Sequence, residues 1–367
     1  LRKLPPSSQR ALSFAACIGH VFDIATLSIV GKEPPFEIAR ALGPAIEDGL
    51  LLPLDPDYRF VQSALKDGRP PSAETAAVRY RFLHDRVQQA AYSLIDEVER
   101  PGVHLHIGRL LVSRHRGTAL DTQLFDVVSH WNRGIALLTD DKERHFLAEL
   151  NLRAGQKAKA ALAFQSGAEH LRIGLSLLDS DLAPSVQKRE LGRALRRAWA
   201  ECELLAGHFD LSELLLNGLL SEASEPLMQA ELHNLRVVLY TAAGRFADAL
   251  AAGTAGLKLL GVELPVGDTE LQEALGREFS AVAAILEARG IATANMSALI
   301  DAPQCRDRRV QLLLRALTHI TPVIYITGPM LYPLVIALHV RASLEFGHTE
   351  VSAYGYMAYA FILSVGM

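Results

Sequence analysis

The stretch Ala-Gly-Arg-Phe-Ala-Asp-Ala at residues 243–249 decides the fold, because a close variant, Ala-Gly-His-Phe-Asp-Leu-Ser, occupies residues 206–212. In both copies a glycine follows an apolar helical pattern, and an aromatic residue two positions later opens a second helical pattern that contains small residues. Glycine turns the chain sharply, and small residues let the second helix approach the first. The sequence therefore predicts repeated units of helix, turn and helix.

Helical patterns are nearly uninterrupted from Val103 onward, with weaker echoes of the repeated stretch at Gly155 and Gly347. The two clear copies lie 37 residues apart, which is within the range of tetratricopeptide-like repeats. We therefore expect residues 102–367 to form an α-solenoid of tetratricopeptide-like helix pairs, truncated at its C-terminus.

The first hundred residues differ, because short helical patterns alternate there with strand-like segments. Helices are expected at residues 7–16, 22–30 and 35–49. Ser7 or Ser8 is expected to cap the first helix, since serine side chains accept hydrogen bonds from first-turn amides. Gly49 is expected to end the third helix as its C′ residue.

Two apolar segments in this region have the pattern of strands. Residues 50–53 form one, and residues 78–82, which alternate between apolar and polar side chains, form the other. They can pair as a hairpin across the polar, proline-rich residues 55–74. Three helices and such a hairpin make a small winged-helix domain, assigned to residues 1–101, so the fold class is mainly α. We place the boundary at residues 101–102, where the pattern changes.

The composition is that of a folded chain with more than one domain: 367 residues, of which 50% are hydrophobic and 21% charged. The 37 Lys and Arg against 41 Asp and Glu leave a net charge of -4, which supplies no overall field for nucleic acid or an anionic membrane. The most membrane-like stretch, residues 320–340, is interrupted by prolines, a glycine and a histidine. We expect no direct nucleic-acid contact and no membrane span.

The cysteines predict the cellular compartment. Cys17, Cys202 and Cys305 lie far apart in apolar stretches, as buried thiols in a reducing compartment do. The chain also opens without a basic segment followed by an apolar run, which is the pattern of a secretory signal. These features predict a cytoplasmic protein.

The sequence contains no motif of a known catalytic or nucleotide-binding site. It has no phosphate-cradling loop, dinucleotide fingerprint, kinase catalytic loop, nucleophile elbow or zinc-type cysteine pair. His104 and His106 flank Leu105, but side chains two residues apart on a helix point about 200° from each other and cannot share one ion without help. We therefore expect them to be polar positions beside a core leucine. The sequence argues against a complete active site and predicts no catalytic residue, metal ligand or cofactor within this chain.

Two groups of residues are candidates for binding. Arg193, Arg196 and Arg197 form a basic cluster on one expected helix, and they are either a solvated face or a contact for a partner. His84 and Asp85 lie where the strand at residues 78–82 ends and an amphipathic helix begins. Asp85 favours the helix N-terminus electrostatically, and His84 is placed to donate a hydrogen bond to a phosphate held nearby.

Several longer phrases resemble the region just downstream of the ATPase module in large bacterial signalling proteins. That module belongs to the STAND class, the signal transduction ATPases with numerous domains, which is found in hybrid histidine kinases and serine/threonine kinases. The phrases are at residues 4–19, 22–23, 48–50, 82–92, 104–111, 151–158, 243–249 and 344–348. Together they extend over nearly the whole chain.

The resemblance implies a winged-helix domain that follows an AAA-like nucleotide-binding domain, and then a tetratricopeptide-like sensor scaffold. ATP or ADP is implied for the absent upstream domain, and the kinase or other output domain lies elsewhere in the polypeptide. The tetrad at residues 82–85 also resembles the Met-His-Asp motif of related ATPases, whose histidine touches the ADP β-phosphate. Phe82 and Leu83 depart from that motif. The resemblance thus marks His84 and Asp85 as nucleotide-sensing candidates.

The function expected from these observations is regulatory. The chain is expected to be a non-catalytic sensor segment of an ATP-dependent signal-transduction kinase, which couples a protein or small-molecule signal to neighbouring ATPase and kinase domains. The alternative is the regulatory segment of a STAND-type transcriptional activator of the maltose-regulator kind, with its DNA-binding domain elsewhere. An enzyme complete within these residues is disfavoured.

Overall fold

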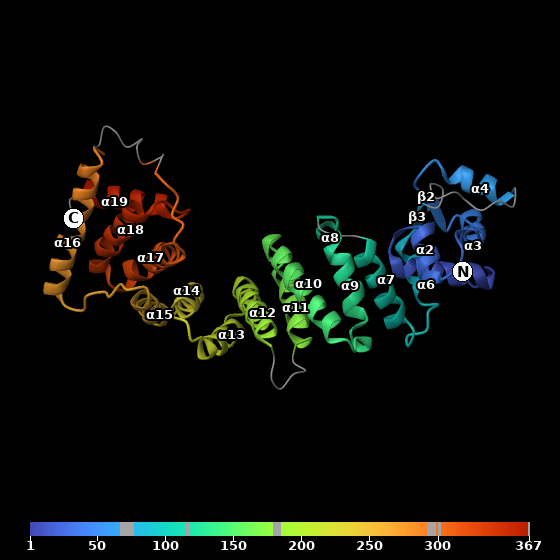
Figure 1. Cartoon of the computed structure of the whole chain (residues 1–367), viewed down its shortest axis with the longest axis horizontal. Helices are drawn as coiled ribbons and strands as arrows, with labels where there is room; N and C mark the ends of the chain where they lie inside the picture. Colours follow the sequence, from blue (N-terminus) through green and yellow to red (C-terminus); the bar gives the residue numbers. More distant parts are fainter. Residues whose placement is uncertain (67–76, 115–117, 179–184, 292–298, 300–301, 366–367) are drawn as a thin grey trace. The chain divides into compact units, whose positions relative to one another are not determined.

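The computed structural model (Figure 1) describes most of the chain. The described residues are 1–66, 77–114, 118–178, 185–291, 299 and 302–365. They are mainly helical, with a small antiparallel sheet near the N-terminus. The chain divides into two compact units. The first unit is Leu1–Ala154 with Ile173–Pro184, and the second is Gly155–Arg172 with Ser185–Met367.

The first unit begins with three helices, as the sequence predicts: α1 (Pro6–Ile18), α2 (Ile24–Gly31) and α3 (Pro35–Glu47). Helix α1 starts with Pro6 in its first turn and no described side chain caps it, so the expected serine cap is wrong. The fixed φ of proline preorganises this start instead. Helix α2 starts later than expected, because the Asp23 carboxylate accepts a hydrogen bond of 2.6 Å from the Thr26 amide and caps the helix there.

Helix α3 ends as the sequence predicts. Gly49 has a left-handed backbone with φ of 68° and lies one residue beyond the C-cap Asp48. The Gly49 amide donates to the Ile46 carbonyl at 3.0 Å, and the Leu50 amide donates to the Ala45 carbonyl at 2.9 Å. This pair of bonds satisfies the last carbonyls of the helix and sends the chain directly into a strand.

The strands β1 (Val21–Asp23), β2 (Leu51–Pro53) and β3 (Arg79–Phe82) form an antiparallel sheet with β3 in the centre. The expected pairing of the second and third of these is confirmed, with Leu51 opposite Phe82. Strand β1 was not expected, and it places Phe22 against Phe82, with ring centroids 5.6 Å apart. The expected polar connection contains helix α4 (Tyr58–Lys66), and its residues 67–76 lie outside the described part.

The other elements described in the first unit are helices: α6 (Asp85–Tyr92), α7 (Arg100–Arg114), α8 (Thr118–Thr122), α9 (Leu124–Arg133), the 3-10 turn η1 (Ile135–Leu137), most of α10 (Asp141–Ala160) and the end of α11 (Phe164–Ser176). Pro101 and Gly102, where the sequence pattern changes, lie in the first turn of α7. Ile107 of this helix is buried with Cys17 of α1 and Val30 of α2 in one apolar cluster.

The second unit contains α12 (Val186–Leu205), α13 (Phe209–Glu222), α14 (Pro226–Ala242), α15 (Phe246–Leu259), α16 (Asp268–Ala288), α17 (Arg308–Thr327), the 3-10 turn η3 (Pro329–Leu331), α18 (Tyr332–Phe346) and α19 (Ser352–Val365). Helices α12 to α15 pack each on the next along the chain, and α17 packs on α14, α15 and α18. Figure 1 shows α16, α17, α18 and α19 close together.

The repeated stretches form the same turn. Gly207 and Gly244 have φ of 84° and 72°, and each lies just beyond a helix C-cap. The Gly244 amide donates to the Thr241 carbonyl at 3.1 Å, and the following amide donates to the Tyr240 carbonyl at 2.8 Å. The corresponding bonds follow α12. The predicted helix, turn, helix units at these positions are confirmed.

The expected echo at Gly155 is wrong. Gly155 lies inside α10, where an added Cβ would come within 2.4 Å of the Leu171 side chain, so this glycine allows α11 to approach closely. The turn that ends α10 instead uses Leu162, a non-glycine residue with φ of 61°. At Gly347, by contrast, the backbone is left-handed with φ of 101° and α18 ends there.

The most membrane-like stretch is divided between two helices. Helix α17 ends at Thr327, Gly328 and η3 follow, and α18 begins at Tyr332. By length and composition α17 alone, among the described residues, passes as a helix able to cross a membrane, yet half of its apolar window is buried inside the fold. Leu317, Ile320 and Ile324 of α17 are fully buried among other helices, as in the core of a helical protein.

The three cysteines are free and buried, as expected from the sequence. Burial raises the pKa of the Cys17 thiol to about 12 and that of the Cys202 thiol to about 11. These thiols are therefore protonated at neutral pH and behave as small apolar side chains.

We predict that Gly244→Val lowers the free energy of unfolding by at least about 1–2 kcal/mol, because a left-handed backbone is strained for a residue with a Cβ. Chemical denaturation followed by circular dichroism measures the change. The matched control is Gly276→Val in α16, at an exposed helical glycine with open space around it. The control should stay within about 0.5 kcal/mol, and an equal loss in both variants would contradict the role of the turn.

Candidate functional site

The basic cluster predicted on α12 lies on one helix but does not act as one group. Ser185 caps this helix by accepting a hydrogen bond of 3.2 Å from the Lys188 amide. Arg193 and Arg197, one turn apart, line a cavity of the second unit. Arg196 lies outside it and makes two hydrogen bonds to the Glu222 carboxylate, at 2.6 and 2.7 Å. The structure thus brings two of the three predicted arginines together.

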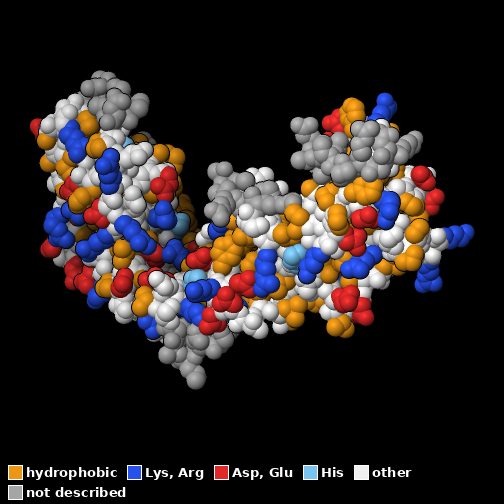
Figure 2. Space-filling model, turned by 45° about the vertical axis from the view of Figure 1, so that its right-hand side comes forward, with side chains coloured by type: hydrophobic (Ala, Val, Ile, Leu, Met, Phe, Trp, Pro, Cys, Tyr) orange, Lys and Arg blue, Asp and Glu red, His pale blue; other side chains and the backbone are white. Residues whose placement is uncertain are grey.

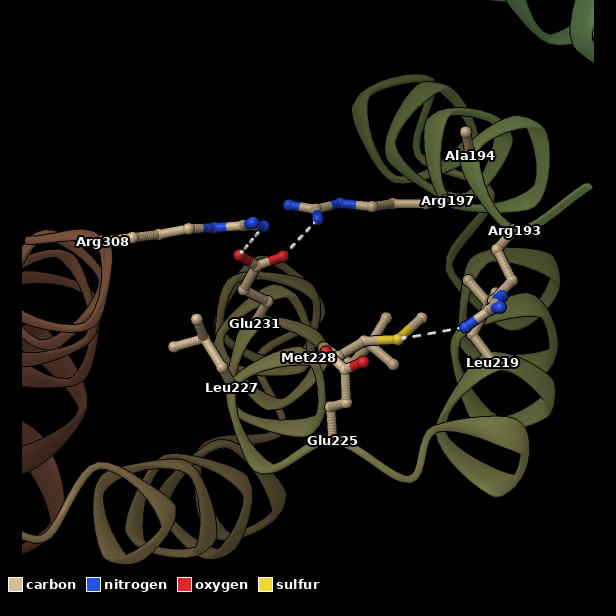
Figure 3. A pocket seen from close by; sticks show the side chains of 10 residues that line it. Arg193, Ala194, Arg197, Leu219, Glu225, Leu227, Met228, Glu231 and Arg308 are labelled. Atoms are coloured by element: carbon tan, nitrogen blue, oxygen red, sulfur yellow. Dashed lines mark hydrogen bonds and ion pairs between the residues drawn. The ribbon is translucent and has the colours of Figure 1, made fainter. Parts of the chain in front are cut away.

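The cavity encloses about 270 Å³ between four helices. Helix α12 contributes the two arginines and Ala194, α13 contributes Leu219, and the start of α17 contributes Arg308. The remaining lining residues come from the first turns of α14 and the residue before it: Glu225, Leu227, Met228, Glu231 and Leu232. Figure 3 shows these side chains around the open space.

Glu231 is the electrostatic centre of one wall. Its carboxylate accepts a hydrogen bond of 2.7 Å from Arg308 with one oxygen and a hydrogen bond from Arg197 with the other (Figure 3). Its side chain is only 12% exposed. Burial acts to raise the pKa of Glu231, but the hydrogen bonds and charges of Arg308 and Arg197 outweigh it and hold the pKa below its usual value. Glu231 therefore ties α12, α14 and α17 together as an anion.

Arg193 forms the opposite wall. Its guanidinium points toward Met228 in Figure 3, and its Nη1 lies 3.9 Å from the Met228 sulfur, a weak acceptor. In the described part of the chain it makes no ion pair with a carboxylate. Glu225, the N-cap residue of α14, lines the same cavity and likewise forms no ion pair with any described residue. The cavity thus holds two paired arginines and one separated pair of opposite charges.

Elsewhere, basic side chains are mixed with acidic ones. Over the face drawn in Figure 2, Lys and Arg side chains are interspersed with Asp and Glu. Arg245 of the second unit, outside the cavity, likewise contacts both Glu213 and Asp248. Such exposed pairs contribute little to stability, about 0–1 kcal/mol each.

The second predicted site, at His84 and Asp85, lies in the first unit. His84 is the N-cap residue of α6 with an extended backbone, and no described side chain caps this helix. Both side chains are exposed, and the Asp85 carboxylate lies 3.5 Å from the Nδ1 of His20. The corner therefore presents an exposed histidine at the N-terminus of a helix, which is a position that favours anions.

The sequence did not predict a buried pair of histidines in the first unit. His104 of α7 is buried, not merely polar beside Leu105, and its Nδ1 lies 2.9 Å from the Nδ1 of His130 on α9. Its Nε2 lies 3.0 Å from the Tyr92 hydroxyl. Burial and then the nearby His130 lower the pKa of His104 to about 4, and burial also lowers the pKa of His130, so both rings are neutral at pH 7. No group of three or more His, Cys, Asp or Glu side chains in the described residues is placed to hold a metal ion.

Comparison with known proteins relates the chain to signalling kinases. No family model matches it. It is 24% identical over 418 aligned positions to hybrid signal transduction histidine kinase G of Dictyostelium discoideum. The chain is a distant relative of this kinase. The alignment covers 100% of the chain but 12% of the kinase, so the chain spans about an eighth of the length of this relative.

Among solved structures, a STAND protein with a tetratricopeptide repeat sensor from Pyrococcus horikoshii matches at 13% identity with a TM-score of 0.37. This match covers 100% of the chain and 46% of that protein. The resemblance in the sequence is to bacterial signalling proteins, whereas the related hybrid kinase is from Dictyostelium discoideum, a eukaryote.

We predict that Glu231→Gln lowers the free energy of unfolding by about 1–3 kcal/mol, because two arginines lose their buried anionic partner. Since the folded pKa of Glu231 is depressed, its stabilisation is present above the unfolded pKa of about 4.5 and is lost as the pH falls through the folded value. Denaturation between pH 7 and pH 3 measures this.

The control is Glu222→Gln, at the exposed partner of Arg196, which should cost less than about 1 kcal/mol at pH 7. The difference between the unmodified chain and Glu231→Gln should shrink below pH 4.5. A difference that stays constant down to pH 3 would show that the charge of Glu231 is not what stabilises the fold.

Proposed function

We propose that this chain is a regulatory, non-catalytic segment of a multidomain ATP-dependent signal-transduction kinase. The observation that carries the proposal is the extent of the alignment, which runs along the whole chain yet occupies 12% of a hybrid histidine kinase. A segment of that size is one part of a much longer polypeptide. In the proposal, ATP or ADP is bound by a neighbouring ATPase domain, phosphoryl transfer belongs to a kinase domain, and the protein works in the cytoplasm.

The architecture within the proposal has two functional parts. The three N-terminal helices and the β2–β3 hairpin support a winged-helix domain at residues 1–101. The consecutive packing of α12 to α15, with left-handed turns at Gly207 and Gly244, supports a tetratricopeptide-like solenoid over residues 102–367. Strand β1, which adds Phe22 to the sheet core, extends the expected wing.

Signal transmission in this proposal is a shift between populations. A protein or small molecule binds the solenoid, and nucleotide binds the ATPase domain. Each ligand binds more tightly to one of two states, which differ in how the winged-helix domain docks on the ATPase domain. Coupling then requires only that each ligand has different affinities for the two states. The cavity between Arg193 and Glu231 is the candidate place of signal binding, since it joins helices that are distant in sequence.

His84 and Asp85 are proposed to sense the nucleotide. His84 is exposed at the N-terminus of α6, so its ring is available to a phosphate on a neighbouring domain. One imidazole and one helix N-terminus supply only part of a phosphate site. Nucleotide binding is therefore expected of the complete polypeptide, and weak or absent in this chain alone.

We predict that His84→Ala changes the free energy of unfolding of this chain by less than about 0.5 kcal/mol, because the side chain is exposed and caps nothing. In the complete polypeptide the same variant should release ADP faster and raise basal ATPase activity. Stopped-flow release of fluorescent ADP measures the effect. His106→Ala, at a surface histidine of α7, is the control and should leave ADP release unchanged. Normal ADP release in His84→Ala would end the nucleotide-sensing role.

We predict that the purified chain, incubated with Mg²⁺ and radiolabelled ATP, neither hydrolyses ATP nor becomes phosphorylated. Removing residues 185–367, most of the second unit, from the complete polypeptide should leave autophosphorylation measurable but no longer responsive to the signal. Hydrolysis or phosphorylation by the chain alone would refute a non-catalytic role. The transcriptional-activator alternative would be favoured if the complete polypeptide shows no phosphorylation at all and the deletion abolishes its activity in DNA-dependent transcription.

A further inference from the structure

The cavity on α12 contains two opposite charges that the fold leaves without ionic partners. Among the described residues, Arg193 makes its one hydrogen bond to the Met228 sulfur and no ion pair, and Glu225 forms no ion pair with any of them. The charge of Arg193 also acts on Glu222, but that carboxylate makes its hydrogen bonds to Arg196. A guanidinium and a carboxylate that line one cavity without pairing are free to bind opposite charges of a ligand.

The other charges of the cavity are already neutralised. Arg197 and Arg308 share the carboxylate of Glu231, and Arg197 also contacts Glu201 at 3.2 Å. An anionic ligand that approached this wall would have to displace an internal carboxylate. The position open to a ligand anion is therefore Arg193.

Between the charged groups the wall is apolar. Leu219 and Leu232 are almost fully buried, and Leu227 and Met228 are partly exposed beside them. Figure 3 shows Met228 and Leu219 next to Arg193. A ligand that fits this wall has an apolar group attached close to its charges. The volume of about 270 Å³ admits a small molecule rather than a folded partner.

The start of helix α14 adds a further preference. Pro226 occupies its first turn, no described side chain caps it, and Glu225, Leu227 and Met228 at this end all line the cavity. The first-turn amides and the positive end of the helix favour a carboxylate near this point. This attraction at the start of α14 adds to that of Arg193 for a ligand carboxylate.

We infer that the cavity binds a free α-amino acid with an apolar side chain of about the size of leucine or methionine. The ligand carboxylate pairs with Arg193, its ammonium group pairs with Glu225, and its side chain packs on Leu219, Leu227 and Met228. The zwitterion pairs with both Arg193 and Glu225. A simple carboxylate would leave Glu225 unpaired, and the two negative charges would repel each other. That this amino acid is the signal rests on the proposed regulatory function, whereas its binding does not.

The test is isothermal titration calorimetry of the whole 367-residue chain with L-leucine and L-methionine. Matched ligands separate the contacts: 4-methylpentanoate lacks the ammonium group, 3-methylbutylamine lacks the carboxylate, and glycine lacks the apolar group. Each should bind at least about tenfold more weakly than L-leucine, because each loses one contact of the three. These comparisons use the unmodified chain and do not depend on the folding of any variant.

Variants then assign the contacts. Arg193→Gln and Glu225→Gln should each weaken L-leucine binding at least about tenfold, while 4-methylpentanoate should lose affinity only in Arg193→Gln. Arg196→Gln is the matched control, because Arg196 is next to Arg197 in sequence but pairs with Glu222 and does not line the cavity. This variant should bind L-leucine normally. Melting curves confirm that each variant is folded.

Two outcomes overturn the inference: absence of L-leucine and L-methionine binding at millimolar concentration, or binding that Arg193→Gln and Glu225→Gln leave unchanged. Equal affinity for L-leucine and 4-methylpentanoate would also overturn it, in favour of a simple carboxylate site. Failure of the regulatory proposal looks different. In that case L-leucine binds as described, but autophosphorylation of the complete polypeptide does not respond to it.

Discussion

The left-handed backbone at the helix ends is the constraint on which the second unit depends. At Gly207 and Gly244 the glycine amide and the amide after it bond back to the last carbonyls of the helix, and the chain reverses within a few residues. Helix α13 can then pack on α12, and α15 can pack on α14; α14 also lies against α13 and α17, and its Glu231 reaches Arg197 of α12. The turn at Gly207 and the packing of α14 on α13 and α17 together bring the cavity residues, more than a hundred positions apart in sequence, to one place.

The sequence predicted those features whose causes are local. Glycine followed by an aromatic residue identifies the turn at Gly244, and alternation identifies β3, because backbone conformation and side-chain period are properties of a short segment. The Ala-Gly pair at residues 154–155 gave a wrong prediction of a turn, because Gly155 lies inside a helix and its small size is needed for the approach of Leu171. Strand β1 was missed since a segment of three residues is a strand only through its pairing with β3.

The same distinction applies to the site. Arg193 and Arg197 were found because their spacing of four places them on one side of a helix. Arg308 and Glu225 were not predicted as part of the site, because the turns and the packing of α17 decide which distant side chains join Arg193 and Arg197. The pairing of Arg196 with Glu222, which removes it from the cavity, is equally a tertiary property. His104 shows the limit again, since its buried partner His130 lies 26 positions away.

Occupancy of the cavity and the ion pairs of Glu231 act on the same helix. Arg193 and Arg197 are one turn apart on α12, so a ligand that joins Arg193 to Glu225 fixes α12 to the start of α14, next to the place where Arg197 reaches Glu231 and, through it, Arg308. Binding of the proposed ligand would therefore stabilise one arrangement of α12, α14 and α17. A preference of 5- to 150-fold for that arrangement corresponds to about 1–3 kcal/mol, which is the usual size of allosteric coupling. In the proposed regulatory function, a cavity so small suffices to transmit a signal because it lies where three helices already share one carboxylate.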